Sequence, residues 1–221
     1  MLVSMPLPRT AFLPDTPDTR LLIDLTSQAN DLSEAAHALG CALDAGEGSN
    51  LWEPLTSHAV TAYVRPFIVS KVRARLDEMP EVPGLPPNLQ SVHDRIRKYR
   101  NTTIAHSQSE LVMPLPVVII DDEGHGVDVI GVTVTHPMPH AFAQRFAELI
   151  STSEEIVDQA TQPVLERLRA WLRDETPQTI NDWQRPKVTH AADIDFTAAR
   201  ARRRAPRFTN YWGIEHSPGH E

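Results

Sequence analysis

The nineteen prolines of this 221-residue chain constrain its fold more than any other feature, because proline lacks a backbone N–H and ends or kinks a helix. Most of them fall in three clusters, at residues 6–17, 80–87 and 114–139. The first predicts an extended N-terminal arm over residues 1–18, the second a stiff linker, and the third an irregular region. Long helices are therefore expected between these clusters.

Between the proline clusters, apolar side chains recur at alternating steps of three and four residues, which is typical of amphipathic helices. Four helices are expected: from the end of the arm to Gly46, from Asn50 to Met79, from an N-cap at Asn88 to about Ser109, and from His140 to Arg173. Pro66 and Pro163 should bend the second and fourth of these.

The hydrophobic period changes between the third and fourth helices. Val117–Ile120 and Val127–Val134 are rich in β-branched residues and flank the acidic, glycine-containing segment 121–126, so a β-hairpin is expected over residues 117–135. The pattern weakens after Thr176, which predicts a C-terminal tail over 176–221, with a short helix at 191–205, that packs on the bundle or on a partner. The predicted fold class is all-α: an antiparallel four-helix-type bundle over residues 19–175, with an inserted β-hairpin and a C-terminal tail.

Charge and composition exclude several classes of protein. The formal net charge of −8 argues against indiscriminate nucleic-acid binding, although a local basic strip could still bind. Cys41, the only cysteine, cannot form an internal disulfide. No apolar run reaches the roughly 18 residues of a membrane span and no secretory leader is recognisable, so we expect a cytoplasmic protein without membrane contact. The segment from Asp121 to His125 could hold a metal, but a polar turn explains it better, and no metal or cofactor is expected.

The most informative segment is His93-Asp94-Arg95-Ile96-Arg97-Lys98-Tyr99-Arg100-Asn101-Thr102-Thr103-Ile104-Ala105-His106. It ends in an Arg-Asn pair followed by a histidine. This pattern resembles the R-x(4–6)-H motif of the HEPN superfamily, which lies late in a helix of an α-helical bundle, and the layout is similar to abortive-infection HEPN proteins. The resemblance implies a metal-independent endoribonuclease, such as a toxin or antiphage effector, with Arg100 and His106 catalytic and Asn101 supporting them.

The residue types suit RNA cleavage by transesterification. An arginine stays charged at working pH and offers a forked donor to a phosphate that gains negative charge in the transition state. A histidine can take the proton of the ribose 2′-hydroxyl or protonate the leaving oxygen near neutral pH. Arg100 and His106 supply these two groups, and Asn101 could orient either the histidine or the phosphate.

The spacing alone is weak evidence, since short motifs recur by chance. Arg185 and His190 also satisfy the R-x(4–6)-H spacing, but Pro186 follows the arginine and no amphipathic helix surrounds them. Helical context therefore favours Arg100 and His106. A purely structural interpretation remains open, in which His106 interacts with the helix end and the basic residues form a solvated face.

Further basic residues are candidates for RNA binding. Arg97 and Lys98 precede the motif on the same predicted helix. Arg200, Arg203, Arg204 and Arg207 would share one side of a helix in the tail and form a phosphate-binding strip, although a favourable positive helix end explains them better.

Geometry favours assembly of two chains. Six residues at about 100° each would leave Arg100 and His106 roughly 120° apart on one helix. HEPN-type enzymes bring two copies of the motif into one cleft, so a homodimer is expected, with an antitoxin or nucleotidyltransferase as a further candidate partner. The alternative function is a non-catalytic HEPN-like module that binds nucleotide, RNA or a partner protein.

Overall fold

The computed structural model describes residues 10–104, 111–185, 188–189 and 208–209. Its α-helices are α1 (Pro17–Ala45), α2 (Trp52–Val64), α3 (Pro87–Tyr99), α4 (His140–Asp174) and the short α5 (Pro177–Asp182). The strands are β1 (Val112–Ile120), β2 (Gly126–Thr135), and a short parallel pair, β3 (Val188–Thr189) and β4 (Phe208–Thr209). The prediction of a predominantly helical fold with an inserted antiparallel hairpin is confirmed.

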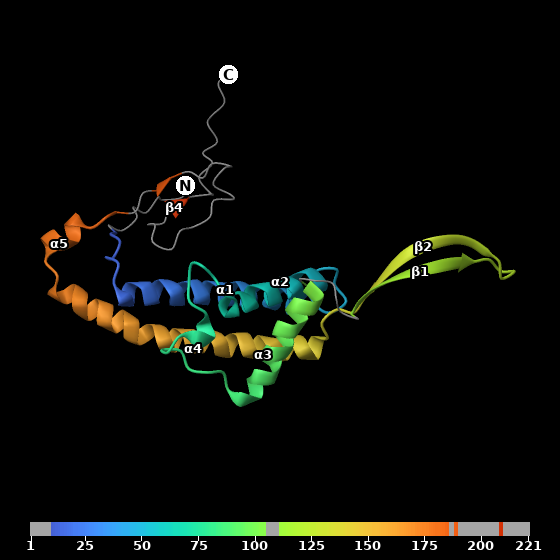
Figure 1. Ribbon diagram of the computed structural model, residues 1–221, viewed down its shortest axis with the longest axis horizontal. Helices are drawn as coiled ribbons and strands as arrows, with labels where there is room; N and C mark the ends of the chain where they lie inside the picture. The colour runs from blue at the N-terminus through green and yellow to red at the C-terminus, as the bar shows by residue number, and fades with distance from the viewer. Residues whose placement is uncertain (1–9, 105–110, 186–187, 190–207, 210–221) are drawn as a thin grey trace, which may run out of the picture.

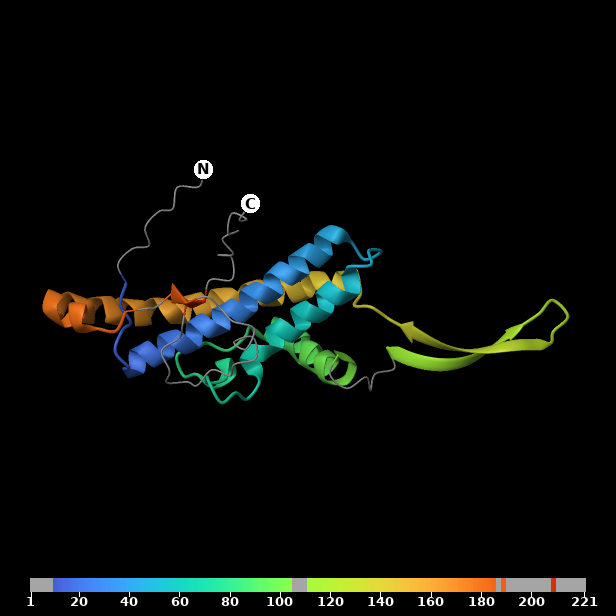
Figure 2. The same ribbon diagram turned by 90° about the horizontal axis from the view of Figure 1, so that it is seen from above.

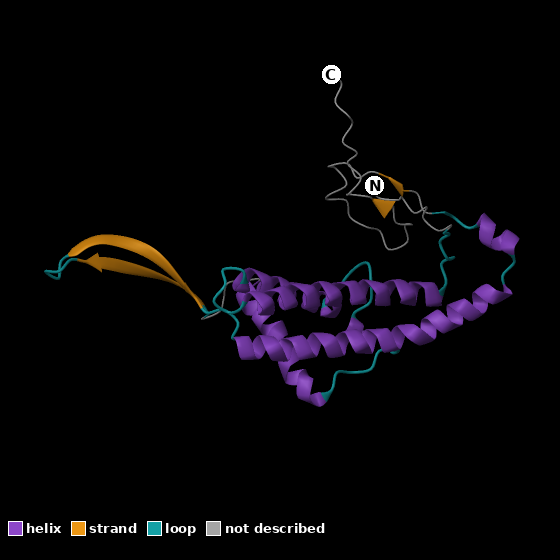
Figure 3. Cartoon of the chain, turned by 180° about the vertical axis from the view of Figure 1, so that it is seen from behind, coloured by secondary structure: helices purple, strands orange, loops and turns teal. Residues whose placement is uncertain are grey.

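Helix α1 packs against both α2 and α4, and these two helices run in the direction opposite to α1 (Figures 1 and 2). Helix α3 crosses α4 steeply instead of lying along it (Figure 1). The hairpin β1–β2 extends away from one end of the helices (Figure 3). None of the helices in the described ranges is long and apolar enough to cross a membrane.

The core lies where the apolar stripes of the helices meet. Its largest fully buried apolar side chains are Leu25, Leu32, Leu39, Trp52, Val60, Tyr63, Val92, Ile96, Phe146, Leu149 and Ile150. They come from α1, α2, α3 and α4, so all four main helices share one hydrophobic core.

Helix α1 begins at Pro17 and so includes the last two residues of the predicted N-terminal arm. Thr16 is its N-cap and its hydroxyl accepts a hydrogen bond from the backbone N–H of Thr19 at 3.1 Å. Pro17 occupies the first helical position, where a missing N–H costs nothing. The helix ends at Gly46, whose φ of 82° suits glycine. The predicted arm over 1–18 was therefore too long by two residues, and its residues 1–9 lie outside the described part of the chain.

The prediction of one kinked helix from Asn50 to Met79 was wrong. Helix α2 ends at Val64, and a 3-10 turn over Arg65–Phe67 follows, because Pro66 cannot continue the helical hydrogen bonds. Val69 is 81% exposed, although its spacing from Ala62 and Leu76 would place it on the apolar face of such a helix. Leu76 in the 3-10 turn Leu76–Glu78 is still buried.

Polar contacts with α1 hold the irregular segment between these two turns. Arg73 pairs with the buried Asp31 and donates to Ser27 Oγ at 2.8 Å. The backbone of Ala74 is also held, because its N–H donates to Asp24 Oδ2 at 3.1 Å and its carbonyl accepts from Gln28 Nε2 at 2.8 Å. These long-range bonds replace the helical bonds that the apolar spacing predicted.

Helix α3 begins at Pro87 after Pro86, one residue before the expected start, and no side chain caps it. The α-helix stops at Tyr99 and continues as a π-helical segment, Arg100–Ile104. The predicted end near Ser109 lies outside the described residues.

The hairpin is longer than predicted, because β1 begins at Val112 and includes Pro114 and Pro116. The N–H of His136 donates to the carbonyl of Leu111 at 2.8 Å, which makes these two residues a hydrogen-bonded pair. Hydrogen-bonded and non-bonded pairs alternate along an antiparallel ladder, so the even-numbered residues of β1 point their backbone groups away from β2. The two prolines therefore remove no hydrogen bond from the ladder, which explains why the expected irregular region is a strand.

Helix α4 runs without a break through Pro163 to Asp174. After α5, Trp183 stacks on Trp171 of α4 with ring centroids 5.5 Å apart. The N–H of Phe12 donates to the carbonyl of Gln184 at 2.8 Å. This part of the tail packs on the helical body, while the helix expected at 191–205 lies outside the described residues.

Candidate functional site

The predicted catalytic arginine lies where the helix changes its hydrogen-bonding pattern. Arg100 is the first residue of the π-helical segment, and its Nη1 donates to Oδ1 of Asn101 at 3.1 Å. Asn101 is exposed, and Thr102 donates to the carbonyl of Lys98 at 2.9 Å. Short π-helical segments are rare and often occur at functional sites. The structure thus brings Arg100 and Asn101 together on an accessible and unusual turn.

Several predicted residues fall outside the described part of the chain: His106, Arg200, Arg203, Arg204 and Arg207. The π-helical segment also removes the premise that Arg100 and His106 are separated by six α-helical steps, because residues 100–104 do not have α-helical geometry. The estimate of roughly 120° between them therefore does not apply, and the case for a homodimer needs other evidence.

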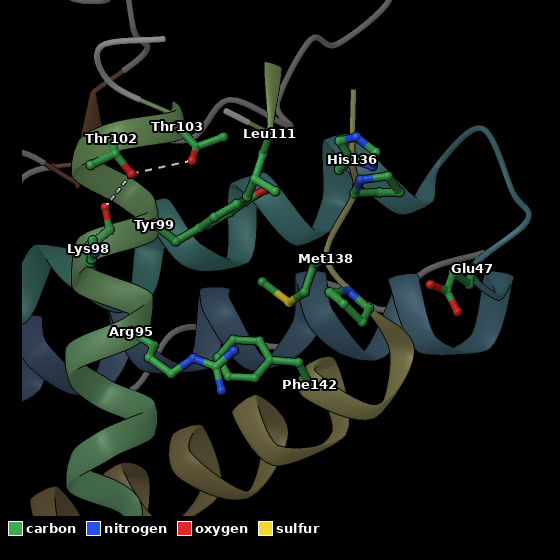
Figure 4. Close-up of a pocket in the computed structure, with 12 residues that line it drawn as sticks. Glu47, Arg95, Lys98, Tyr99, Thr102, Thr103, Leu111, His136, Met138 and Phe142 are labelled. Carbon is green, nitrogen blue, oxygen red and sulfur yellow. Dashed lines mark hydrogen bonds between the residues drawn. The ribbon is translucent and has the colours of Figure 1, made fainter. Parts of the chain in front are cut away.

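A cavity of about 720 Å³ lies between α3, the π-helical segment, the base of the hairpin and the start of α4 (Figure 4). Its lining residues are Glu47, Arg95, Lys98, Tyr99, Thr102, Thr103, Leu111, His136, Pro137, Met138, Pro139 and Phe142. Of the predicted RNA-binding residues Lys98 lines this cavity, and Arg97 does not. We refer to it as the α3 cavity.

The α3 cavity combines cationic and aromatic groups. The guanidinium of Arg95 lies 4.3 Å from the ring centre of Phe142, a cation–π contact that holds the arginine at the cavity wall. Burial, and then the charge of Glu53, raise the pKa of Tyr99, so its phenol is a hydrogen-bond donor at neutral pH. The lining has two cationic side chains, Arg95 and Lys98, and one acidic side chain, Glu47. It therefore suits a planar or anionic ligand.

A second cavity, of about 260 Å³, lies on the other side of α3. It is lined in part by His93, Arg97, Asp77 and Ser153. Sequence reasoning missed His93 as a candidate, although His93 and Arg97 are four residues apart and so share a helix face. The four-residue spacing of His93 and Arg97, on a helix with a buried face, could have identified these residues as candidates from the sequence.

His93 is buried and makes specific contacts. Its Nδ1 lies 2.8 Å from the hydroxyl of Tyr63, and its ring packs edge-on against Phe67 with centroids 4.5 Å apart. Burial raises the pKa of Tyr63, so its hydroxyl keeps its proton. Burial, and then the positive charge of Arg97, lower the pKa of His93. The histidine is therefore neutral in the folded protein at neutral pH.

We expect the free energy of unfolding to fall as the pH drops below about 6.5 because of His93. Its pKa is lower in the folded than in the unfolded chain, so the unfolded chain binds the proton first and acid favours unfolding. One proton contributes at most about 1.4 kcal/mol per pH unit. Urea unfolding at several pH values should show a smaller loss for His93→Gln than for the parent, whereas His37→Gln, at an exposed position, should keep the parent's slope. Equal slopes for parent and His93→Gln would contradict the assignment.

Among the described residues, no group of three or more histidine, cysteine, aspartate or glutamate side chains is arranged to hold a metal ion. Comparisons with family models, with curated proteins and with solved structures gave no match for this chain. The functional proposal therefore depends on the motif and on the geometry of α3.

Proposed function

We propose that this protein is a HEPN-like endoribonuclease that cleaves RNA without a metal ion. The observation that carries the proposal is the π-helical segment that begins at Arg100, because it presents the Arg100-Asn101 pair at the end of α3. We propose that the helices form a HEPN-like four-helix bundle, with the motif at the end of the third main helix.

In the proposed reaction, Arg100 binds the scissile phosphate and stabilises the charge that develops on it. His106 takes the proton of the 2′-hydroxyl or protonates the leaving 5′-oxygen, solvent water exchanges the other proton, and Asn101 orients the reacting groups. The 2′-oxygen attacks phosphorus as the bond to the 5′-oxygen breaks. The products are a 2′,3′-cyclic phosphate and a 5′-hydroxyl.

The lining of the α3 cavity supports RNA as the ligand. Lys98 and Arg95 supply positive charge, and Tyr99 supplies an aromatic face, beside the segment that carries Arg100. Aromatic faces and cations together bind single-stranded nucleic acid with little dependence on base sequence. In the cell we propose a cytoplasmic toxin or antiphage effector, with an antitoxin or nucleotidyltransferase as its partner.

The test is incubation of the purified full-length chain with mixed cellular RNA in the presence of EDTA. We expect cleavage to fragments that end in 2′,3′-cyclic phosphate and 5′-hydroxyl groups. Absence of cleavage across structured and unstructured RNAs would contradict the proposal.

A second candidate function is a non-catalytic module that binds a nucleotide in the α3 cavity. Its volume of about 720 Å³ lies within the roughly 300–1,000 Å³ of small-molecule sites. Calorimetric titration with nucleotides, compared between the parent and Lys98→Ala, distinguishes this function, because binding without RNA cleavage would favour it.

A further inference from the structure

The hairpin β1–β2 exposes an unusual amount of apolar surface. Eleven aliphatic side chains on its two strands are each at least 37% exposed: Met113, Leu115, Val117, Val118, Ile119, Ile120, Val127, Val129, Ile130, Val132 and Val134. Together they expose on the order of 800 Å², which exceeds the roughly 300–600 Å² of the largest apolar patch on a typical monomer. An isolated two-stranded hairpin is at best marginally stable in water. An exposed apolar patch of this size is typical of an interaction surface.

The register divides the hairpin into two unequal faces. The cross-strand pairs Met113–Val134, Leu115–Val132 and Val117–Ile130 lie on one face, because side chains alternate along a strand and opposed residues share a side. We call this the aliphatic face. The opposite face is interrupted by the pairs Pro114–Thr133 and Pro116–Gly131. The aliphatic face is the better docking surface, because three consecutive apolar pairs run along it before the pair Ile119–Asp128 adds a carboxylate near the turn.

The outer edge of β1 is unsuited to strand addition. The backbone of Pro114 and Pro116 points outward along this edge, and neither residue has an N–H to donate. An added strand would find no donor at these two positions. A partner that packs on the aliphatic face needs no backbone hydrogen bonds and is not affected.

We propose that the hairpin is a dimerisation arm, in which the aliphatic face of one chain packs on the same face of a second copy with the two hairpins antiparallel. An aliphatic face that packs on its own copy is self-complementary, as a two-fold interface requires. The aliphatic face supplies about half of the hairpin's exposed apolar surface, so the proposed interface is at the small end of the range for specific dimers. The dimer does not depend on the proposed ribonuclease activity.

Charge determines the direction of packing. The turn of the hairpin carries Asp121, Asp122 and Glu123, whereas Arg95 and Lys98 line the cavity at its base. Parallel hairpins would bring six carboxylates together. Antiparallel hairpins instead place each acidic turn beside the base of the other hairpin, since the two ends of a hairpin this long lie about 30 Å apart. Opposite charges then lie near one another at both ends of the interface.

The first experiment is sedimentation velocity on the full-length chain at about 10 µM, with one lysine placed on either face. We expect the parent to be a dimer and Ile130→Lys to weaken association at least 100-fold, because it buries an unpaired charge in the interface. Val129→Lys is the matched control, since Val129 is the adjacent residue on the opposite face and is 68% exposed. It should remain a dimer. A monomeric parent, or equal effects of the two lysines, would overturn the proposal.

Circular dichroism of the same samples separates loss of dimerisation from loss of folding. The hairpin extends away from the helices, so both lysine variants should keep the helical signal of the parent (Figure 3). If Ile130→Lys also loses its helical signal, the more conservative Ile130→Ser replaces it, and a dimer that survives this change would count against the proposal.

The second experiment tests the antiparallel arrangement by disulfide formation in a Cys41→Ser background. Ile130 lies near the middle of the hairpin, and Met113 lies near its base. We expect Ile130→Cys to form covalent dimers on mild oxidation and Met113→Cys to form none, because only central residues meet their own copies in antiparallel packing. Efficient cross-linking at both positions would show parallel hairpins, and cross-linking at neither would overturn the proposed interface.

Discussion

Replacing Arg100 with alanine is expected to reduce RNA cleavage at least about 10²-fold while changing the free energy of unfolding by no more than about 0.5 kcal/mol. Its side chain is half-buried, and the hydrogen bond it makes is with the neighbouring Asn101, so the fold should depend little on it. The proposed reaction depends on it strongly, because the guanidinium stabilises the charged phosphate. Rates with a labelled RNA and melting curves on the same preparation measure the two effects.

His106→Ala should lose about 10²- to 10⁴-fold in rate, the usual contribution of general acid–base catalysis. Arg185→Ala provides the matched control, because Arg185 and His190 also satisfy the R-x(4–6)-H spacing but Pro186 follows the arginine. It should cleave RNA like the parent. If Arg100→Ala and His106→Ala cleave RNA as fast as the parent and the Arg185→Ala control, the nuclease is a contaminant and the binding-module function is favoured.

Trp52→Ala is expected to destabilise the fold by about 3–5 kcal/mol, the typical cost of truncating a buried aromatic side chain. Trp52 is 1% exposed, its Nε1 donates to the carbonyl of Met138 at 2.8 Å, and its ring stacks on His140 with centroids 5.8 Å apart. The residue therefore joins the start of α2 to the start of α4. Its loss would leave both a cavity and a buried carbonyl without its donor.

Urea unfolding monitored by circular dichroism measures this effect. Trp52→Phe should destabilise the fold less than Trp52→Ala. It loses the same hydrogen bond but keeps most of the side-chain volume. The adjacent Leu51→Ala should change stability little, since Leu51 is 53% exposed. A Trp52→Ala variant as stable as Leu51→Ala would contradict the role of Trp52 in joining the two helices.

Helices with a local apolar pattern could be predicted from the sequence more closely than segments held by contacts with distant residues. Helices α1 and α4 were predicted nearly to their ends, because their apolar stripes are local. The segment after Pro66 was predicted wrongly because its conformation depends on Arg73 and Asp31, which are far apart in the chain. Apolar residues can recur at helical spacing by chance in a segment whose backbone conformation is set by such distant contacts.

The candidate site was predicted in part for the same reason. Arg100 and Asn101 could be selected from their order and helical context, which are properties of the chain itself. The α3 cavity could not be predicted, because Lys98, His136 and Phe142 meet only when the hairpin base and α4 pack beside α3. The burial of His93 likewise depends on Tyr63 and Phe67 from another part of the chain.

The sequence by itself determined the helical class, the position of the inserted hairpin and the residues of the motif, because hydrophobic period, proline placement and turn composition act over a few residues. Contacts between distant segments determine where α2 ends, that α3 continues as a π-helix, and which face of the hairpin carries three consecutive apolar pairs. The first of these depends on polar contacts between distant segments, and the last on strand register. Local spacing predicts neither feature, because each depends on the relative free energies of alternative arrangements of the whole chain.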